Sequence, residues 1–107
     1  MKSRVDLTIR PEAIEEIRAA RDWYRGQDLD SGAEFLRDLA HSVSILLAAP
    51  RVGRYLPRMR ARTLALRSFP FVIIYRLRGK PDGNDMVEIL AVAHGSRRPG
   101  YWRDRDR

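Results

Sequence analysis

The stretch "FPFVIIYRLRGKPDGNDMVEILAVAH" (Phe69–His94) decides the fold. Two runs of strand length, rich in β-branched and aliphatic residues, flank the turn signal Asp82-Gly83. That arrangement predicts two antiparallel strands joined as a hairpin. The segment "FVIIY" (71–75) is apolar on both faces, so we expect it to be a central strand of the sheet.

Two helices are expected before this hairpin. Pro11 suits the first turn of a helix, and the apolar stripe that follows it fades near Gly26. The segment "SGAE" (31–34) has capping-box spacing, and it predicts a second helix from about residue 32 to residue 49, closed by Pro50. Because the link between them is short, we expect an antiparallel helical hairpin.

The remaining segments complete a single domain over residues 1–107. "RVDLTI" (4–9) alternates polar and apolar residues as a strand does, "RVGRYLPRMR" (51–60) has the glycine and proline of a loop, and "ARTLALR" (61–67) has strand composition. We therefore predict an α+β fold of order β-α-α-β-β-β, in which the helical hairpin packs on one face of a small, mainly antiparallel sheet. The sequence leaves open where the first strand pairs.

The positive charge is concentrated in the second half of the chain. The formal net charge is +7, and residues 51–107 carry 14 of the 21 Lys and Arg residues but only 5 of the 14 acidic ones. All but one of those 14 are arginines, whose planar guanidinium groups suit phosphate and carboxylate partners. The charge therefore predicts an acidic macromolecular partner, or else no more than a solvated basic surface.

Several classes of protein are disfavoured. The chain has no cysteine and two histidines, so neither a disulfide framework nor a thiolate metal site is expected. It also lacks a glycine-rich phosphate loop, a nucleophile elbow and metal-ligand spacing, so we expect no metal and no cofactor. No apolar run approaches the ~20 residues of a membrane span, and the N-terminus lacks the apolar core of a signal peptide. We therefore expect a soluble, cytoplasmic protein.

Two groups of residues are candidates for function. Arg58, Arg60 and Arg62 would project from one side of a strand and could follow a phosphate backbone, or they could charge an edge strand against aggregation. The second group lies in "AHGSRRPGYW" (93–102), which gathers His94, Arg97, Arg98, Tyr101 and Trp102. Its aromatic and guanidinium planes could stack on a base or anchor a protein partner, while the two aromatic residues could instead cover an open core edge.

These segments resemble the ParE/RelE superfamily of bacterial type II toxins. The resemblance covers "VDLTIRPEAIEEIRAARDWY", "PRVGRYLPRMR", "LRSFPFVIIYRL" and "VEILAVAHGSRRPGYW", and the last is similar to the closing segment of ParE-like members. It implies a toxin silenced by a cognate antitoxin, often of ParD type, whose C-terminal segment wraps the toxin. The resemblance also implies that promoter DNA is bound only through the antitoxin.

The superfamily divides by target. Tyr101 and Arg97 match site residues of RelE-like ribonucleases, but Val72 stands where those proteins commonly carry an arginine. The resemblance therefore implies a ParE-like inhibitor that binds DNA gyrase, with a ribosome-dependent mRNA endoribonuclease using Arg97, Tyr101 and His94 as the alternative.

The resulting expectations name two surfaces. The toxic surface is predicted at the C-terminal group (His94, Arg97, Arg98, Tyr101 and Trp102), with the arginine row (Arg58, Arg60 and Arg62) as a secondary candidate. The antitoxin is expected in the groove between the helices and the sheet, with binding residues Leu36, Leu39, Val43, Leu46 and Arg67.

Overall fold

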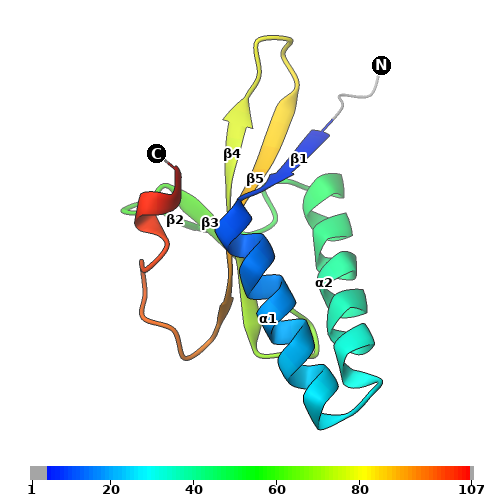
Figure 1. The fold of residues 1–107 in the computed structure, drawn as a ribbon. Coiled ribbons are helices and arrows are strands. Elements are labelled where there is room, and N and C mark those ends of the chain that lie inside the picture. Colours follow the sequence, from blue (N-terminus) through cyan, green and yellow to red (C-terminus); the bar gives the residue numbers. More distant parts are fainter. Residues whose placement is uncertain (1–4, 107) are drawn as a thin grey trace.

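The computed structural model describes residues 5–106 and has the predicted order of elements (Figure 1). Its elements are β1 (Val5–Ile9), α1 (Pro11–Gln27), α2 (Ser31–Ala48), β2 (Arg54–Leu56), β3 (Ala61–Ala65), β4 (Phe71–Gly79), β5 (Asp85–His94) and the short 3-10 helix η1 (Arg103–Asp106). The α+β prediction is confirmed: two antiparallel helices pack against one face of a five-stranded mixed sheet.

The strand order is β1-β5-β4-β3-β2, so β4 is the central strand, as its two apolar faces predicted. The structure also settles the pairing that the sequence left open. β1 runs parallel to β5 at one edge, with Leu7 opposite Val87, whereas all other neighbours are antiparallel. A parallel pair needs a long crossover connection, and here it comprises the α1–α2 hairpin followed by β2, β3 and β4.

The helical hairpin and the inner face of the sheet enclose the larger hydrophobic core. Alternate residues of the central strands face the helices, namely Ile73, Tyr75, Val87, Ile89 and Val92. From the helices, Phe35 and Leu46 are fully buried, and Phe35 lies in a cluster of aromatic rings 5.2 to 5.7 Å apart with Tyr24, Phe69 and Phe71. This packing follows from the apolar stripes on the helices and fixes the hairpin to the sheet.

A bulge in the β4–β5 ladder changes which residues face the opposite side. Ile74 pairs with Ala91 and Tyr75 pairs with Ile89, so the register skips Leu90. A bulge leaves its extra residue without a ladder partner. As a result, Leu90 and Ala91 both join the second, smaller apolar cluster, which also contains Trp102.

Two local predictions are wrong. The segment 51–60, expected to be a loop, contains β2, which pairs with β3 at the other edge of the sheet. Three residues are too few to show a strand pattern in the sequence. Ser31 is not the N-cap of α2: Asp30 takes that position without a side-chain cap bond, and the Asp28 carboxylate accepts the Asp30 amide instead.

Candidate functional site

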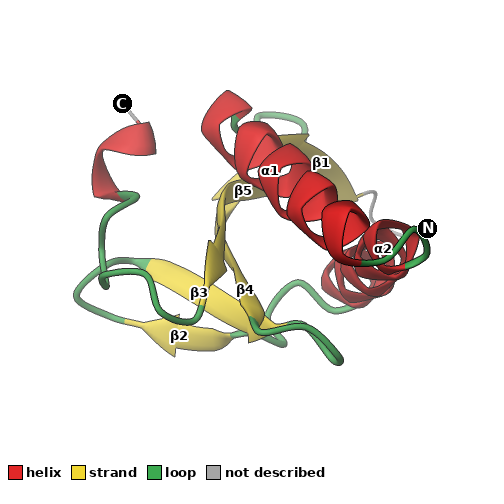
Figure 2. Ribbon diagram, turned by 60° about the horizontal axis from the view of Figure 1, so that its bottom comes forward, coloured by secondary structure: helices red, strands yellow, loops and turns green. Residues whose placement is uncertain are grey.

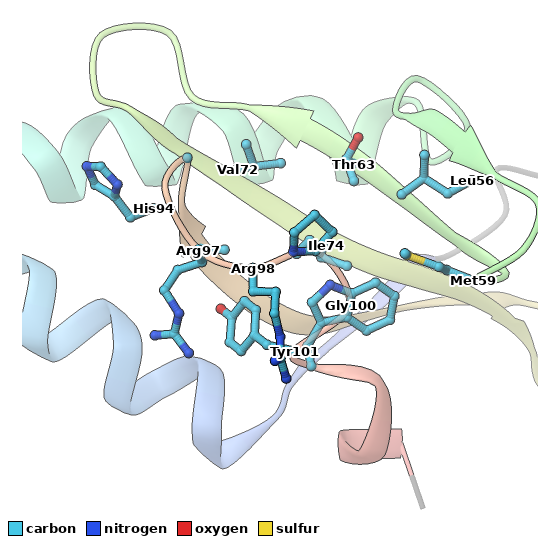
Figure 3. Close-up of a pocket in the computed structure, with 14 residues that line it drawn as sticks. Leu56, Met59, Thr63, Val72, Ile74, His94, Arg97, Arg98, Gly100 and Tyr101 are labelled. Atoms are coloured by element: carbon cyan, nitrogen blue, oxygen red, sulfur yellow. The ribbon is translucent and has the colours of Figure 1, made fainter.

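The C-terminal group lies at a hollow on the sheet face opposite the helices. The segment after β5 turns back beneath β4, and together they enclose a hollow of about 200 Å³ (Figures 2 and 3). Its lining combines apolar side chains with basic ones: Leu56, Met59, Val72, Ile74, Ala93, His94, Arg97, Arg98, Tyr101 and Trp102, among others. The prediction that residues 94–102 form one surface therefore agrees with this geometry, whereas their role stays a prediction.

Apolar atoms form most of this lining, and the exposed arginines stand at its rim. Trp102 is only 2% exposed and packs in the second apolar cluster. It therefore covers a core edge, and its indole plane is not free to stack on a base. Arg97 and Arg98 are exposed, and they carry the positive charge beside the hollow (Figure 3).

Arg76 on β4 supports the other wall of the hollow. Its guanidinium lies 5.7 Å from the centre of the Trp102 ring, and it donates hydrogen bonds of 2.9 Å to the carbonyls of Met59 and Arg60. Arg60 has a φ of 51°, in the left-handed region that most side chains avoid. Arg76 thus helps to hold a strained turn in place.

Tyr101 is held by three charged side chains. The Arg97 and Arg105 guanidinium carbons lie 3.9 Å and 4.9 Å from its ring centre, within the range of cation–π attraction. Its hydroxyl donates a 2.5 Å hydrogen bond to Oε2 of Glu16 on α1. The ring therefore connects the exposed Arg97 to a partly buried carboxylate.

Glu16 is the centre of a network that sequence reasoning missed. Its carboxylate accepts two hydrogen bonds from the Arg105 guanidinium, at 2.8 and 3.1 Å, one from the Tyr101 hydroxyl and one of 3.1 Å from the Val92 amide. Arg105 also donates to the carbonyl of Leu90, the residue that the bulge leaves outside the ladder. In the sequence, Glu16 signals no more than favourable charge early in a helix.

This environment sets the protonation of the phenol. Burial first, and then the Glu16 hydrogen bond, raise the pKa of Tyr101 from 10.0 to about 12. The same carboxylate raises the pKa of Arg105. The Tyr101 hydroxyl thus stays protonated near neutral pH and is already committed as a donor to Glu16.

His94 lies at the end of β5. Its ring meets Phe71 edge-on, with ring centres 5.2 Å apart, and its Nδ1 accepts a 3.1 Å hydrogen bond from the Ser96 amide. Since Nδ1 is an acceptor, the neutral ring carries its proton on Nε2. His94 lines the hollow together with Arg97.

The arginine row is not formed. Arg58 and Arg60 lie in the turn between β2 and β3, and only Arg62 belongs to a strand. Arg62 donates to the carbonyls of Arg51 and Gly53 at 3.1 and 3.0 Å, so its charge serves the chain's own loop. The prediction of a row on one side of a strand is wrong because the turn at residues 57–60 interrupts the strand spacing.

The predicted antitoxin-binding residues differ in how far they are exposed. Leu39 and Leu46 are 8% and 0% exposed and belong to the main core, and Val43 packs partly buried against it. Little of the Leu39 and Leu46 side chains is accessible, because the helical stripe packs against the sheet, and the role of these three residues in antitoxin binding stays a prediction. Leu36, which is 37% exposed, and Arg67 remain accessible, so their role in antitoxin binding stays a prediction.

Two further findings concern the described part of the chain. Within residues 5–106, none of the helices combines the length and hydrophobicity of a transmembrane span. Nor do the described side chains gather three His, Asp or Glu residues in the manner of a metal site.

The fold defines this chain as a small α+β domain in which a helical hairpin packs on one face of a mixed sheet. A solved structure described as "Chromosomal ParDE TA system from P. aeruginosa" contains a chain that superposes with a TM-score of 0.70, at 22% identity, over 85% of this chain and 96% of that one. Residues 7–99 match the family described as ParE toxin of type II toxin–antitoxin system, parDE, so the chain belongs to the ParE toxin family. No curated protein sequence matches it. The resemblance drawn from the sequence is thus confirmed.

Proposed function

We propose that this chain inhibits DNA gyrase by binding it through the surface around the C-terminal hollow, and that a cognate antitoxin of ParD type neutralises it. Membership of the ParE toxin family supports a toxin of a type II module. The chromosomal ParDE system of the similar structure supports an antitoxin partner of this kind.

The observation that carries the proposal is the pairing of an apolar hollow with an exposed cationic rim. Arg97 and Arg98 are exposed beside apolar surface, and arginine next to buried aromatic residues is the composition typical of strong protein contacts. The same guanidinium groups suit the phosphates of DNA held in a gyrase complex. The hollow is small and open, so it fits one protruding side chain of a partner.

The state of Tyr101 supports binding over phosphodiester cleavage. A ribonuclease mechanism needs a group near the reaction that accepts or donates a proton at neutral pH. The Tyr101 hydroxyl is bonded to Glu16 and has a pKa of about 12, and Val72 contributes an apolar wall where a cation would stabilise a phosphorane.

The antitoxin is expected to approach with acidic residues. Positive charge in the second half of the chain would speed the association, and a disordered segment would fold upon binding. Of the accessible candidates, Leu36 offers apolar contact and Arg67 offers charge. The proposed antitoxin contact therefore lies beside α2 and the turn between β3 and β4.

The test has two arms with purified protein. In a gyrase supercoiling reaction, the wild type traps cleaved DNA. The double variant Arg97→Ala/Arg98→Ala requires at least ~10-fold more protein for the same effect, because it lacks the cationic rim. A tenfold change corresponds to about 1.4 kcal/mol of binding free energy. The matched control, Arg18→Ala/Arg37→Ala, removes the same charge from exposed helix positions and retains potency. In a translation extract, the wild type leaves transcripts intact; transcript cleavage there, or inactivity on gyrase, would overturn the proposal.

A further inference from the structure

The backbone of the segment that follows β5 forms hydrogen bonds within local turns and not with a neighbouring strand or along a regular α-helix. After Gly95, whose amide bonds the Pro70 carbonyl, the amides of Arg97, Tyr101, Arg103 and Arg105 each bond the carbonyl three residues earlier. These bonds are local turns. We call residues 96–105 the C-terminal strap, because they cross the sheet face opposite the helices (Figure 1).

Side chains therefore hold the strap in place. One contact is apolar: Trp102 is buried against Ala61, Ile74 and Leu90. The polar contacts centre on the carboxylate of Glu16, which accepts hydrogen bonds from both Tyr101 and Arg105. Arg105 also donates to the Leu90 carbonyl, and the Arg76 guanidinium lies over the Trp102 ring. The Glu16 and Arg105 side chains are 17% and 15% exposed, so water competes weakly for these charge-assisted hydrogen bonds.

The Tyr101 ring connects the Glu16 network to the exposed rim of the hollow. Glu16 fixes the Tyr101 hydroxyl, and the Tyr101 ring carries the Arg97 guanidinium at 3.9 Å. Arg97 belongs to the exposed rim, whereas Glu16 is on α1 and outside the hollow's lining. A rim residue is thus linked, through the Tyr101 ring, to a carboxylate of α1.

We propose that Glu16 is a positioning residue for target binding. It holds the strap closed over the second apolar cluster and, through Tyr101, sets Arg97 at the rim of the hollow. This role rests on the proposed function for its biological consequence, but closure of the strap is a property of the chain alone.

Fluorescence of the full chain tests closure directly. Trp23→Phe removes the exposed tryptophan, 61% of which is accessible, and leaves Trp102 as the reporter. In this background, Glu16→Gln shifts the Trp102 emission to longer wavelength and increases acrylamide quenching several-fold, while far-UV circular dichroism is unchanged. Glu15→Gln is the matched control, because Glu15 is the exposed neighbour of Glu16 on α1 and its carboxylate pairs with Arg18 of the same helix.

A second variant guards against misfolding of the first. Arg105→Gln removes the guanidinium fork but leaves Glu16 its bonds to Tyr101 and Val92, and the same increase in quenching is expected to a smaller degree. The effects of Glu16→Gln and Tyr101→Phe do not add, because both break one network. If Trp102 stays as protected in folded Glu16→Gln and Arg105→Gln proteins as in the control, the positioning role is overturned.

The gyrase reaction then separates this inference from the proposed function. Glu16→Gln requires at least ~10-fold more protein than Glu15→Gln to trap cleaved DNA, a loss equal to that of one well-placed charged contact. An open strap with full potency overturns the positioning role alone. A closed strap in a wild type that leaves gyrase unaffected overturns the proposed function and leaves the closure result intact.

Discussion

The two faces of the sheet are covered in different ways. On one face, two regular helices bring large apolar side chains that interlock with β4 and β5. On the other, the strap brings one buried tryptophan and relies on a carboxylate of α1 that lies 85 residues from its tyrosine partner in the sequence. The helix face is stabilised by many weak contacts, whereas the strap face is stabilised by a few strong ones.

This difference assigns distinct tasks to the two faces. A cooperative core of interlocked side chains opens only when the whole domain unfolds, so it gives a rigid support. A segment held by a few polar contacts can open without unfolding the rest. The candidate target surface lies on the second face, where single residues can control its shape.

The largest effect is expected on the helix face. Phe35→Ala removes a fully buried ring from the centre of the aromatic cluster, and such a change costs about 3–5 kcal/mol through lost burial and the cavity left behind. Domains of this size have about 5–15 kcal/mol of stability in total. Urea denaturation followed by circular dichroism measures the loss.

The neighbouring residue gives the control for that prediction. Leu36→Ala changes a side chain that is 37% exposed, and the expected loss is below about 1 kcal/mol. Equal losses for the two variants would show that the helix face is not a closely packed core.

The helix face also contains a buried carboxylate, that of Asp38 on α2. It accepts hydrogen bonds from the amides of Arg67, Ser68 and Phe69 at 3.2, 2.8 and 3.2 Å, which closes the turn between β3 and β4. Asp38→Asn places an amide donor against these donors and is expected to cost about 2 kcal/mol. Chemical denaturation measures this, with the exposed Asp22→Asn as control, expected to be within about 0.5 kcal/mol of the wild type. Equal values would contradict the turn-closing role.

On the strap face, the predicted effect is smaller and local. Arg76→Met keeps an apolar stem but loses the two hydrogen bonds to the carbonyls of Met59 and Arg60, at about 1 kcal/mol. Amide hydrogen exchange should increase at Met59 and Arg60, whose amides bond within the same turn. Arg54→Met, an exposed change on β2, is the control. Faster exchange throughout the domain would mean that the two faces unfold together.

The sequence predicted most of the helix face, because that face follows from periodicity. The apolar stripe of α2 and the strand runs of β4 and β5 recur at the spacings of helices and strands, so their partners could be inferred. The same rule bears on the predicted antitoxin residues, because Leu39 and Leu46 belong to an apolar stripe that packs in the core.

For the strap face, the sequence predicted which residues lie together but not the contacts that hold them. His94, Arg97, Arg98, Tyr101 and Trp102 do meet at one hollow, but the sequence does not reveal the groups that hold them there. Glu16 and Arg105 make a specific polar pair, and polar pairs leave no periodic trace in the sequence. The parallel pairing of β1 escaped for a similar reason, since an edge strand can join either side of a sheet without changing its own pattern.

The smallest effect concerns the titration of Tyr101. Its folded pKa is raised from 10.0 to about 12, so the phenol stabilises the fold fully below pH 10, where both states are protonated. Between pH 10 and pH 12 the unfolded chain ionises first, and stability falls as pH rises.

Tyr101→Phe should remove the tyrosinate absorbance step near pH 12 and reduce that fall in stability, whereas Tyr55→Phe should leave the step in place. Burial also raises the pKa of Tyr24 and Tyr75, so part of the alkaline fall persists in Tyr101→Phe. If the step near pH 12 survives this substitution, it does not arise from Tyr101, and the strap would be held by Trp102 and the Arg105 bonds without the Tyr101–Glu16 contact.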